Sequence, residues 1–308
     1  MRTVFFGTPA WAVPSLEALI ASDIEVVAVV TNPDKPAGRR LEPRPSPVKQ
    51  AAVAADLPVV QVESAKDPQL ADLLGEGRVD VATVVAYGKL LPSALLAVPP
   101  RGFVNVHFSL LPAYRGAAPV QRAVMDGATE TGVSIMVLTA GMDEGPVLAT
   151  VREPIAEDDT AASLGERLAG AGARLLVETL PRYVNGSLEP VEQDHSAATY
   201  APRITNEETR VDWSRSADEI RHLIRGLTPD PGAWTTVNGR RFKIFAAVPV
   251  DASLAPASVR VASGGELLAG TGTGALELVE VQPAGKKTMT GADFVRGLRL
   301  TGNERLGE

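Results

Sequence analysis

One segment carries most of the information about the fold of this chain: Gly102-Phe103-Val104-Asn105-Val106-His107-Phe108-Ser109-Leu110-Leu111-Pro112. Its first half is a nearly continuous apolar run, which is typical of a strand covered on both faces. Successive side chains of a strand point to opposite faces, so Phe103, Asn105 and His107 are expected on one face. A single buried polar group is usually a satisfied core residue. An amide and an imidazole in register at the end of a strand instead indicate a functional site, because burying both is costly.

Similar apolar runs alternate with helical patterns through the first half of the chain. The predicted strands are Thr3–Phe6, Ile24–Thr31, Val59–Val62, Val79–Ala86, Phe103–Phe108 and Val133–Leu138. The predicted helices are Val13–Ala21, Pro47–Ala55, Pro68–Gly75, Ala118–Met125 and Thr160–Tyr183. This order predicts right-handed strand–helix–strand units in an open parallel sheet of the Rossmann-like α/β class. Ligands of such sheets bind beyond the carboxyl ends of the strands.

The pattern changes after Asn185-Gly186-Ser187, where a polar segment without periodicity begins. A helix is predicted at Ser216–Arg225, with Ser216 and Glu219 as a capping box. Asn238-Gly239 predicts a hairpin. The predicted strands of this half are Ala233–Val237, Arg241–Ala246, Ser258–Ala262, Glu266–Ala269 and Ala275–Val281. The sequence therefore predicts a catalytic α/β domain over residues 1–188, a linker over 189–208 and a small OB-like β-barrel over 209–308.

Composition supports two domains and gives them different charge. The chain has 308 residues, which is long for one hydrophobic core, and 45% of them are hydrophobic and 22% charged. Residues 209–308 carry 13 Lys and Arg against 11 Asp and Glu, whereas residues 1–208 carry 17 against 26. The molecule as a whole has a net charge of −7. The barrel is thus the part whose charge is compatible with a nucleic-acid partner.

Several classes of protein are excluded by what the sequence lacks. There is no cysteine, which excludes disulfides, thiolate nucleophiles and cysteine-ligated zinc, and with three histidines no metal site is expected. The turn after Thr3–Phe6 has one glycine instead of the dinucleotide fingerprint, and no Walker A motif occurs. No signal-peptide core or run of about 20 apolar residues is present, so a cytoplasmic protein without membrane contact is predicted. A monomer is expected.

A third polar residue completes a set that can perform acyl transfer to an amine. Asp143 lies in Gly141-Met142-Asp143-Glu144-Gly145, a turn that could equally hold an ordinary Asx cap. The amide of Asn105 and a protonated His107 can donate to the oxyanion that forms when an amine attacks a carbonyl carbon. Asp143 can stabilise the imidazolium and relay protons from the attacking ammonium. No covalent enzyme intermediate is required.

Asn105, His107, the Ser-Leu-Leu-Pro turn and Asp143 resemble the site of the folate-dependent formyltransferases. The resemblance is closest to the members that formylate methionyl-tRNA, and it covers essentially the whole chain. The further motifs that carry it are Phe6-Gly7-Thr8-Pro9, Asn32–Arg39, Pro45–Lys49, Val85–Gly88, Tyr114–Pro119, Val211–Trp213 and Gln282–Lys287. Phe108 departs from the family, which usually has glycine there. Asn206 departs as well, because it stands where the family's linker carries a lysine.

The resemblance implies a reaction and a site. The formyl group of 10-formyltetrahydrofolate would be transferred to the α-amine of initiator methionyl-tRNA, giving N-formylmethionyl-tRNA for translation initiation. Asn105, His107 and Asp143 would be the catalytic residues. The folate, a co-substrate used without a metal, would be bound by Ser109, Leu110, Leu111, Pro112 and Tyr87.

The resemblance also implies two tRNA-binding regions and a contact in the linker. The loop Lys35–Lys49 would lie against the acceptor stem, and its basic residues and prolines suit phosphate binding. The barrel would bind phosphates elsewhere on the tRNA. The residues expected to contact tRNA are Lys35, Arg39, Arg40, Arg44, Lys49, Arg203, Arg240, Arg241, Lys243, Lys286 and Lys287.

Three other functions remain compatible with these residues. The same trio could activate water and release formate from the folate, or transfer formyl to a nucleotide or sugar amine. The chain could also be an RNA-binding module without activity. The basic loop and the barrel favour a tRNA acceptor, because a small acceptor would leave both without a ligand.

Overall fold

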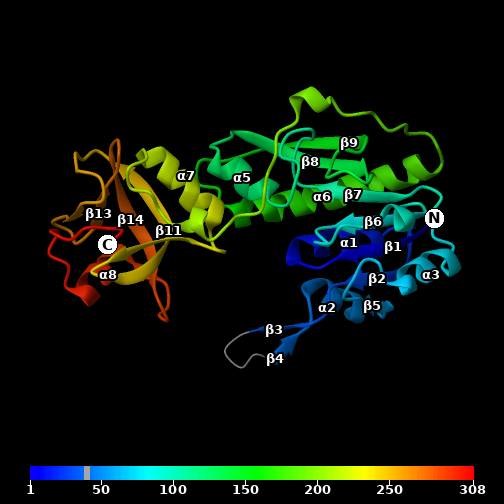
Figure 1. Cartoon of the computed structure of the whole chain (residues 1–308), viewed down its shortest axis with the longest axis horizontal. Helices are drawn as coiled ribbons and strands as arrows, with labels where there is room; N and C mark the ends of the chain where they lie inside the picture. The colour runs from blue at the N-terminus through cyan, green and yellow to red at the C-terminus, as the bar shows by residue number, and fades with distance from the viewer. Residues whose placement is uncertain (38–41) are drawn as a thin grey trace. The chain divides into compact units, whose positions relative to one another are not determined.

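The strand that carries Asn105 and His107 is β7 (Phe103–His107), and it lies inside a seven-stranded sheet with the order β5-β2-β1-β6-β7-β8-β9 (Figure 1). The other strands are β1 (Arg2–Gly7), β2 (Glu25–Thr31), β5 (Val59–Gln61), β6 (Val81–Val85), β8 (Glu130–Val137) and β9 (Val147–Pro154). Pairing is parallel from β5 to β7 and antiparallel from β7 to β9. The Rossmann-like α/β class is confirmed. The antiparallel edge, and β9 itself, are features that the sequence did not predict.

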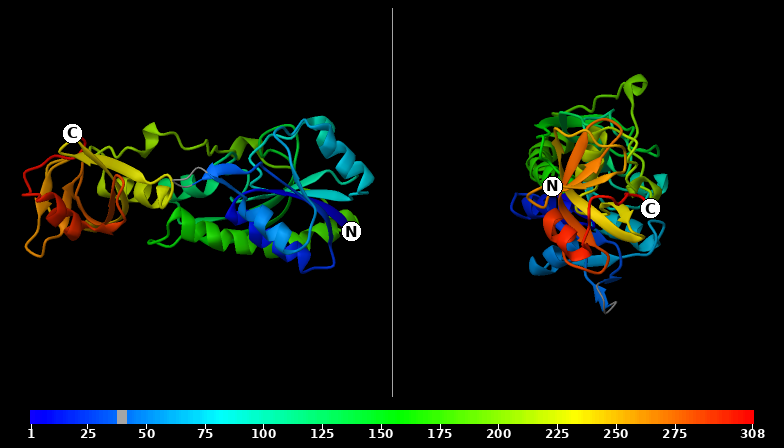
Figure 2. Two further views of the ribbon diagram at one scale, coloured as in Figure 1. Left: turned by 90° about the horizontal axis from the view of Figure 1, so that it is seen from below. Right: turned by 90° about the vertical axis from the view of Figure 1, so that its left-hand side faces the viewer.

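The helices of this sheet change face where the strand order reverses. The chain moves outward from β1 to β2 and β5, and then returns to β6 and β7, so right-handed crossovers place the two sets of helices on opposite faces. Figure 2 shows α1 and α6 on one face and α3 on the other. The helices involved are α1 (Val13–Ile20), α2 (Pro47–Ala54), α3 (Pro68–Glu76), α4 (Ser93–Leu96) and α6 (Ala161–Val184). Because the strands from β5 to β7 are parallel, their carboxyl ends lie at one edge of the sheet. This is the edge at which ligands of such sheets bind.

Alternation along β7 assigns its side chains to the two faces. Phe103 belongs to a buried cluster that includes Leu70 and Leu74 of α3. Val106 contacts α6, where a Cβ at Gly172 would lie 2.8 Å from its Cγ1. Phe108 is buried and stacks edge-on with Trp11, with ring centroids 6.1 Å apart. The residue that departs from the formyltransferase pattern is thus packed in the core.

The second sheet is antiparallel and has the order β10-β11-β14-β13-β12, with β15 paired to β14. Its strands are β10 (Ala233–Val237), β11 (Arg240–Val250), β12 (Val259–Val261), β13 (Leu267–Gly270), β14 (Ala275–Pro283) and β15 (Met289–Thr290). The helix α7 (Ala217–Leu227) begins with the capping box of Ser216 and Glu219 that the sequence predicts. A helix at the end, α8 (Gly291–Leu298), was not predicted. The predicted OB-like architecture is confirmed.

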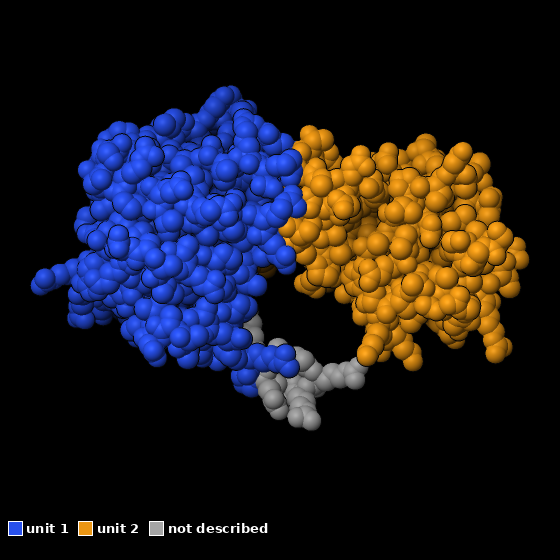
Figure 3. Space-filling model, turned by 180° about the vertical axis from the view of Figure 1, so that it is seen from behind, with its two compact units in different colours: residues 1–119, 130–154, 165–202 blue, residues 120–129, 155–164, 203–308 orange. Residues whose placement is uncertain are grey.

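The structure is a computed structural model that describes residues 1–37 and 42–308, and it divides into two units (Figure 3). Unit 1 comprises Met1–Pro119, Glu130–Pro154 and Gly165–Pro202. Unit 2 comprises Val120–Thr129, Ile155–Leu164 and Arg203–Glu308, and so includes most of α5 (Pro119–Met125). Among the described residues, no helix is both long and apolar enough to span a bilayer.

Much of the segment predicted as a linker belongs to unit 1. Val191 and Val147 exchange backbone hydrogen bonds of 2.9 and 2.8 Å. The Arg115 amide donates to Thr199 at 2.9 Å, and the Ala201 amide donates to Arg115 at 2.7 Å. We call residues 191–201 the strap. Its backbone hydrogen bonds fasten it to β9 and to the segment after Pro112, which a polar, aperiodic sequence does not reveal.

Candidate active site

His107 is buried at the carboxyl end of β7 with both ring nitrogens in defined surroundings. Its side chain is 5% exposed, and its Nε2 lies 2.9 Å from the carbonyl oxygen of Tyr114. A carbonyl oxygen only accepts, so Nε2 carries the hydrogen and Nδ1 is the position that can gain or lose a proton. Nδ1 faces Asp143 Oδ2 at 3.7 Å. Protonation of His107 would therefore place the imidazolium 3.7 Å from a carboxylate, beyond hydrogen-bonding distance.

Asp143 is held next to the imidazole by backbone features of two glycine-containing turns. Its Oδ2 accepts a hydrogen bond of 2.8 Å from the Gly116 amide, and Asp143 itself has a left-handed φ of 52°. Gly116 has a φ of 124°, and a Cβ there would lie 2.7 Å from the carbonyl oxygen of Ala201. Only glycine fits at this position without strain. The structure thus brings together the imidazole and the carboxylate that are far apart in the sequence.

Asn105 completes the set two residues before His107 on the same strand. Its neighbours across the sheet are Val84 of β6 and Met136 of β8. Its side chain is partly exposed and has no hydrogen-bond partner within residues 1–37 and 42–308. The amide is therefore available to donate to a substrate oxygen near the His107–Asp143 pair.

Comparison with known proteins identifies the class of reaction. The family model "Formyl transferase" matches residues 1–180, and the model "Formyl transferase, C-terminal domain" matches residues 203–299. The chain belongs to the formyl transferase family. The catalysed reaction is therefore transfer of a formyl group.

Several relatives are similar to this formyl transferase along its whole length. Methionyl-tRNA formyltransferase of Streptomyces coelicolor is 49% identical over 311 residues, with 100% of both chains covered. The enzymes of the same name from Streptomyces griseus and Thermobifida fusca are 48% and 47% identical, again with 100% of each chain covered.

Solved structures support the fold of this formyl transferase. A sugar 3N-formyl transferase crystallised with dTDP and 5-N-formyl-THF has a TM-score of 0.69 and 17% identity, over 93% of this chain and 99% of that one. HypX from Aquifex aeolicus in complex with tetrahydrofolic acid has a TM-score of 0.66 and 17% identity, over 98% of this chain and 48% of that one. The chain thus spans about half the length of HypX. At this identity the likeness bears on the fold alone.

The residues expected to bind the folate of this formyl transferase fall into two groups. Ser109 is fully buried, and its hydroxyl donates to the Ala113 carbonyl at 2.6 Å. Leu110 is partly exposed. Leu111 and Pro112 line a shallow hollow of about 310 Å³ together with residues 147–150 and 191–194. The Ser-Leu-Leu-Pro turn therefore offers accessible apolar side chains, while its serine stabilises the turn.

Tyr87 differs from the expectation of a ligand-lining side chain. Its ring is 1% exposed and packs edge-on against Phe6 in the core between the sheet and α3. The hydroxyl has no hydrogen-bond partner within the described residues, and burial raises the pKa of Tyr87 to about 12. The Tyr87 carbonyl accepts a hydrogen bond of 2.9 Å from Asn32. A contact between folate and this residue would have to use its backbone.

The predicted basic loop is a hairpin followed by a helix. Lys35 begins β3 (Lys35–Ala37), which pairs antiparallel with β4 (Glu42–Arg44), where Arg44 is exposed. Arg39 and Arg40 lie outside the described residues. Lys49 is in α2, and its ammonium donates to Asp34 at 2.7 Å and to Gln61 at 2.8 Å. The hydrogen bond from Lys49 lowers the pKa of the Asp34 carboxyl.

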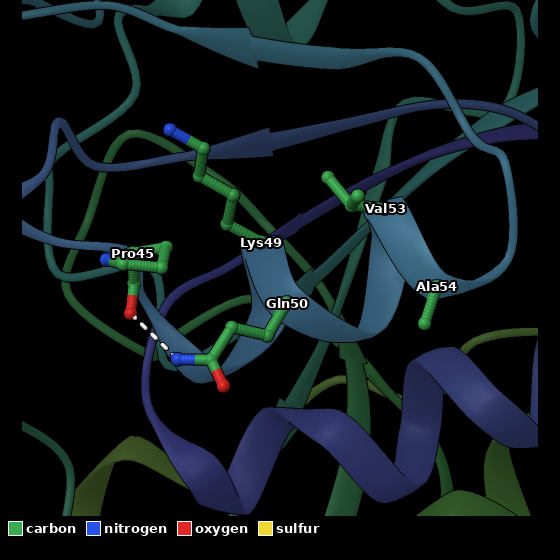
Figure 4. Close-up of a pocket in the computed structure, with 5 residues that line it drawn as sticks. All are labelled: Pro45, Lys49, Gln50, Val53 and Ala54. Atoms are coloured by element: carbon green, nitrogen blue, oxygen red, sulfur yellow. Dashed lines mark hydrogen bonds between the residues drawn. The ribbon is translucent and has the colours of Figure 1, made fainter.

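Lys49 lies beside a shallow hollow of about 440 Å³. Figure 4 shows the residues that line it. The hollow is lined by Pro45, Lys49, Gln50, Val53 and Ala54. Because the Lys49 ammonium is already paired, this residue has a structural role whether or not it also contacts a nucleic acid.

The basic residues expected on unit 2 gather on neighbouring strands. Arg240, Arg241 and Lys243 belong to β11, and Lys286 and Lys287 lie in the turn between β14 and β15, which pair with one another. The Arg241 guanidinium lies 3.8 Å from the ring centroid of Trp234, and that of Arg210 lies 5.8 Å from it. Arg203 is exposed and begins the last segment of unit 2. Sequence reasoning missed Trp234, although it alternates with the buried residues of β10.

Two buried residues next to the trio were also missed. Arg115 is 2% exposed and Gln193 is 8% exposed, and they are hydrogen-bonded to each other. Arg115 lies within a motif that the sequence singled out, but only the strap brings Gln193 to it. Within residues 1–37 and 42–308, no group of three or more His, Asp and Glu residues is arranged to hold a metal ion.

Proposed function

We propose that this formyl transferase takes the formyl group of 10-formyltetrahydrofolate and transfers it to the α-amine of methionine esterified to initiator tRNA. The product would be N-formylmethionyl-tRNA for translation initiation. The observation that carries the proposal is the His107–Asp143 pair together with the Asn105 amide, which has no hydrogen-bond partner in the part of the chain that the structure describes. Sequence identity of 49% over the full length to a methionyl-tRNA formyltransferase supports the choice of acceptor.

The proposed reaction begins when the methionine amine attacks the formyl carbon. A carbon–nitrogen bond forms, and negative charge develops on the formyl oxygen. The Asn105 amide and the Nδ1–H of protonated His107 donate to this oxygen, since Nε2 is occupied by the Tyr114 carbonyl. Asp143 stabilises the imidazolium and accepts a proton from the attacking amine, directly or through water. The oxyanion then collapses, the bond to N10 of the folate breaks, and the proton taken up by Asp143 is delivered to that nitrogen.

The basic side chains provide a reason to prefer a tRNA acceptor over a small amine. Arg240, Arg241, Lys286 and Lys287 are exposed on adjacent strands and turns of unit 2. Cations arranged in this way suit a phosphate backbone and have no role with a nucleotide or sugar acceptor. We further propose that the enzyme acts in the cytoplasm as a monomer.

The direct test uses purified protein, 10-formyltetrahydrofolate labelled in the formyl group, and tRNA charged with methionine. We expect label in an amide on the methionine nitrogen, and none with uncharged tRNA. Label released as free formate would instead indicate the hydrolytic reaction. Formylation of a sugar or nucleotide amine, with none of methionyl-tRNA, would overturn the proposed acceptor.

A further inference from the structure

We propose that Gln193 and Arg115 are positioning residues that hold the Asp143 turn in place for His107. This inference rests on the proposed function. The Gln193 side-chain amide donates to the carbonyl oxygen of Asp143 at 2.9 Å and to that of Gly145 at 2.6 Å. It therefore bonds both ends of the short segment that presents the carboxylate.

The Asp143 turn has reason to need such a restraint. Asp143 adopts a left-handed conformation that is unfavourable for a residue with a side chain, and its neighbour Met142 is 54% exposed. The carboxylate is held by the Gly116 amide, but this hydrogen bond restrains the tip of the side chain only. Gln193 adds restraint on the backbone, which fixes the position of Cα and hence the direction of the carboxylate toward Nδ1.

Arg115 determines which way the Gln193 amide points. Its Nε and Nη2 donate to Gln193 Oε1 at 3.1 and 2.7 Å, and Nη2 also lies 3.1 Å from His195 Nδ1. Guanidinium groups only donate and carbonyl groups only accept, so the oxygen of Gln193 must face Arg115 and its nitrogen must face the turn. Among the described residues, no carboxylate forms an ion pair with this buried guanidinium. A costly buried cation is thus used to orient one amide.

Three consecutive residues connect this arrangement to the imidazole. The Tyr114 carbonyl accepts from His107 Nε2, the Arg115 side chain holds Gln193, and the Gly116 amide donates to the Asp143 carboxylate. The strap that carries Gln193 is bonded to Val147 and to Arg115 itself. The imidazole and the carboxylate are therefore both held by hydrogen bonds to the same short stretch of backbone.

Loss of positioning and loss of the Arg115 charge would change the protonation of His107 in opposite directions. The charged and titratable groups of this network are His107, Asp143, Arg115 and His195, and the Asp194 carboxylate interacts with His195. Removing a nearby cation would favour imidazolium at His107 by simple electrostatics. Releasing Asp143 from its position would disfavour imidazolium. The sign of the change at His107 therefore distinguishes positioning from direct charge.

The test compares Gln193→Met and Arg115→Met with the unchanged enzyme. For both variants we expect kcat to fall about tenfold, from the loss of buried hydrogen bonds, with KM for folate and tRNA within about twofold. At fixed pH and without substrates, 15N NMR of the ring nitrogens should show a smaller imidazolium fraction at His107. With only three histidines in the chain, assignment needs two further variants, His195→Gln and His222→Gln.

Two controls separate positioning from loss of stability. Thr179→Val removes a buried hydrogen bond of 2.6 Å to Leu175 in α6, and it should lower the melting temperature without changing kcat or the His107 signals. Gln193→Glu keeps an acceptor for Arg115 and removes both donations to the turn, so it should reproduce the loss of kcat even if Gln193→Met folds poorly.

Three results would overturn the inference. These are an unchanged kcat in folded Gln193 variants, a larger imidazolium fraction in Arg115→Met, and changes at His107 equal to those of Thr179→Val. The NMR comparison uses no substrate. If the proposed acceptor were wrong, the unchanged enzyme would show no formylation of methionyl-tRNA, while the effect on His107 would still be measured.

Discussion

The carboxyl end of β7 and the outer face of β10 and β11 both present polar side chains, but they differ in how those side chains are held. His107 is buried between a carbonyl and a carboxylate, and few atoms decide its orientation. On the outer face, defined by Trp234, Arg241 and Lys243, the cations are wholly or partly exposed, and Arg241 is held by stacking on Trp234. The first region is built for chemistry that depends on each atom. The second distributes binding over many side chains.

The largest effect is expected at His107. In His107→Ala the oxyanion loses its charged donor, so kcat should fall about a thousandfold while folate binding is largely kept. Single-turnover formylation with saturating folate measures this. A turnover number that stays the same would remove His107 from the mechanism and with it the contrast between the two regions.

Asn105→Leu should have the next largest effect. The substitution preserves shape and removes the amide donor, so we expect kcat to fall about a hundredfold with KM for folate changed less. The comparison of kcat and KM in steady-state assays tests it. A rise in KM alone would mean that Asn105 binds the folate in its ground state and does not act in the transition state.

Tyr87→Phe tests whether the Tyr87 hydroxyl belongs to the core or contacts the folate. Because the hydroxyl is buried and has no hydrogen-bond partner within the described residues, its removal should raise the free energy of unfolding by about 1 kcal/mol. Denaturant unfolding measures this. KM for folate should not change, and an increase would show that the hydroxyl contacts the folate.

Arg241→Ala tests whether binding is distributed over the outer face of unit 2. We expect KM for methionyl-tRNA to rise about threefold and the slope of log affinity against log salt to fall by about one. Arg260→Ala is a matched control, because Arg260 is an exposed arginine on β12, at the opposite edge of the same sheet. A loss of hundreds of fold at Arg241 would mean that this face also depends on single side chains.

The smallest effect concerns the pH dependence of stability in unit 2. Hydrogen bonding to Arg122 lowers the pKa of Glu208 to about 2, from an ordinary value of 4.5. Its contribution to stability is therefore complete above about pH 4.5 and is lost as the pH falls toward 2. The melting temperature of Arg122→Met should differ from that of the unchanged protein more at pH 6 than at pH 3. Glu207→Gln, at a neighbouring exposed carboxyl, should show no such difference.

Local patterns were sufficient for most of the fold. Apolar runs and helical periodicity located six strands of the seven-stranded sheet, four of its helices and α5, which belongs mostly to unit 2, to within a few residues, because both faces of each parallel strand must be covered. Asn238-Gly239 and the Ser216 capping box located the hairpin and α7 for equally local reasons. The strand β9 was missed, although its later positions alternate between partly buried and exposed. The helix α8 was also missed.

The sequence by itself determined the residue types of the site, the strand that carries two of them and the charge of the barrel. Only the tertiary structure decided that Asp143 faces His107 Nδ1, that Tyr87 points into the core, and that Lys49 is paired with Asp34. It also decided that Gln193 and Arg115 hold the Asp143 turn. The physical reason is range: strand and helix patterns are set by neighbouring residues, whereas these side-chain contacts join residues up to 78 positions apart, which no local pattern encodes.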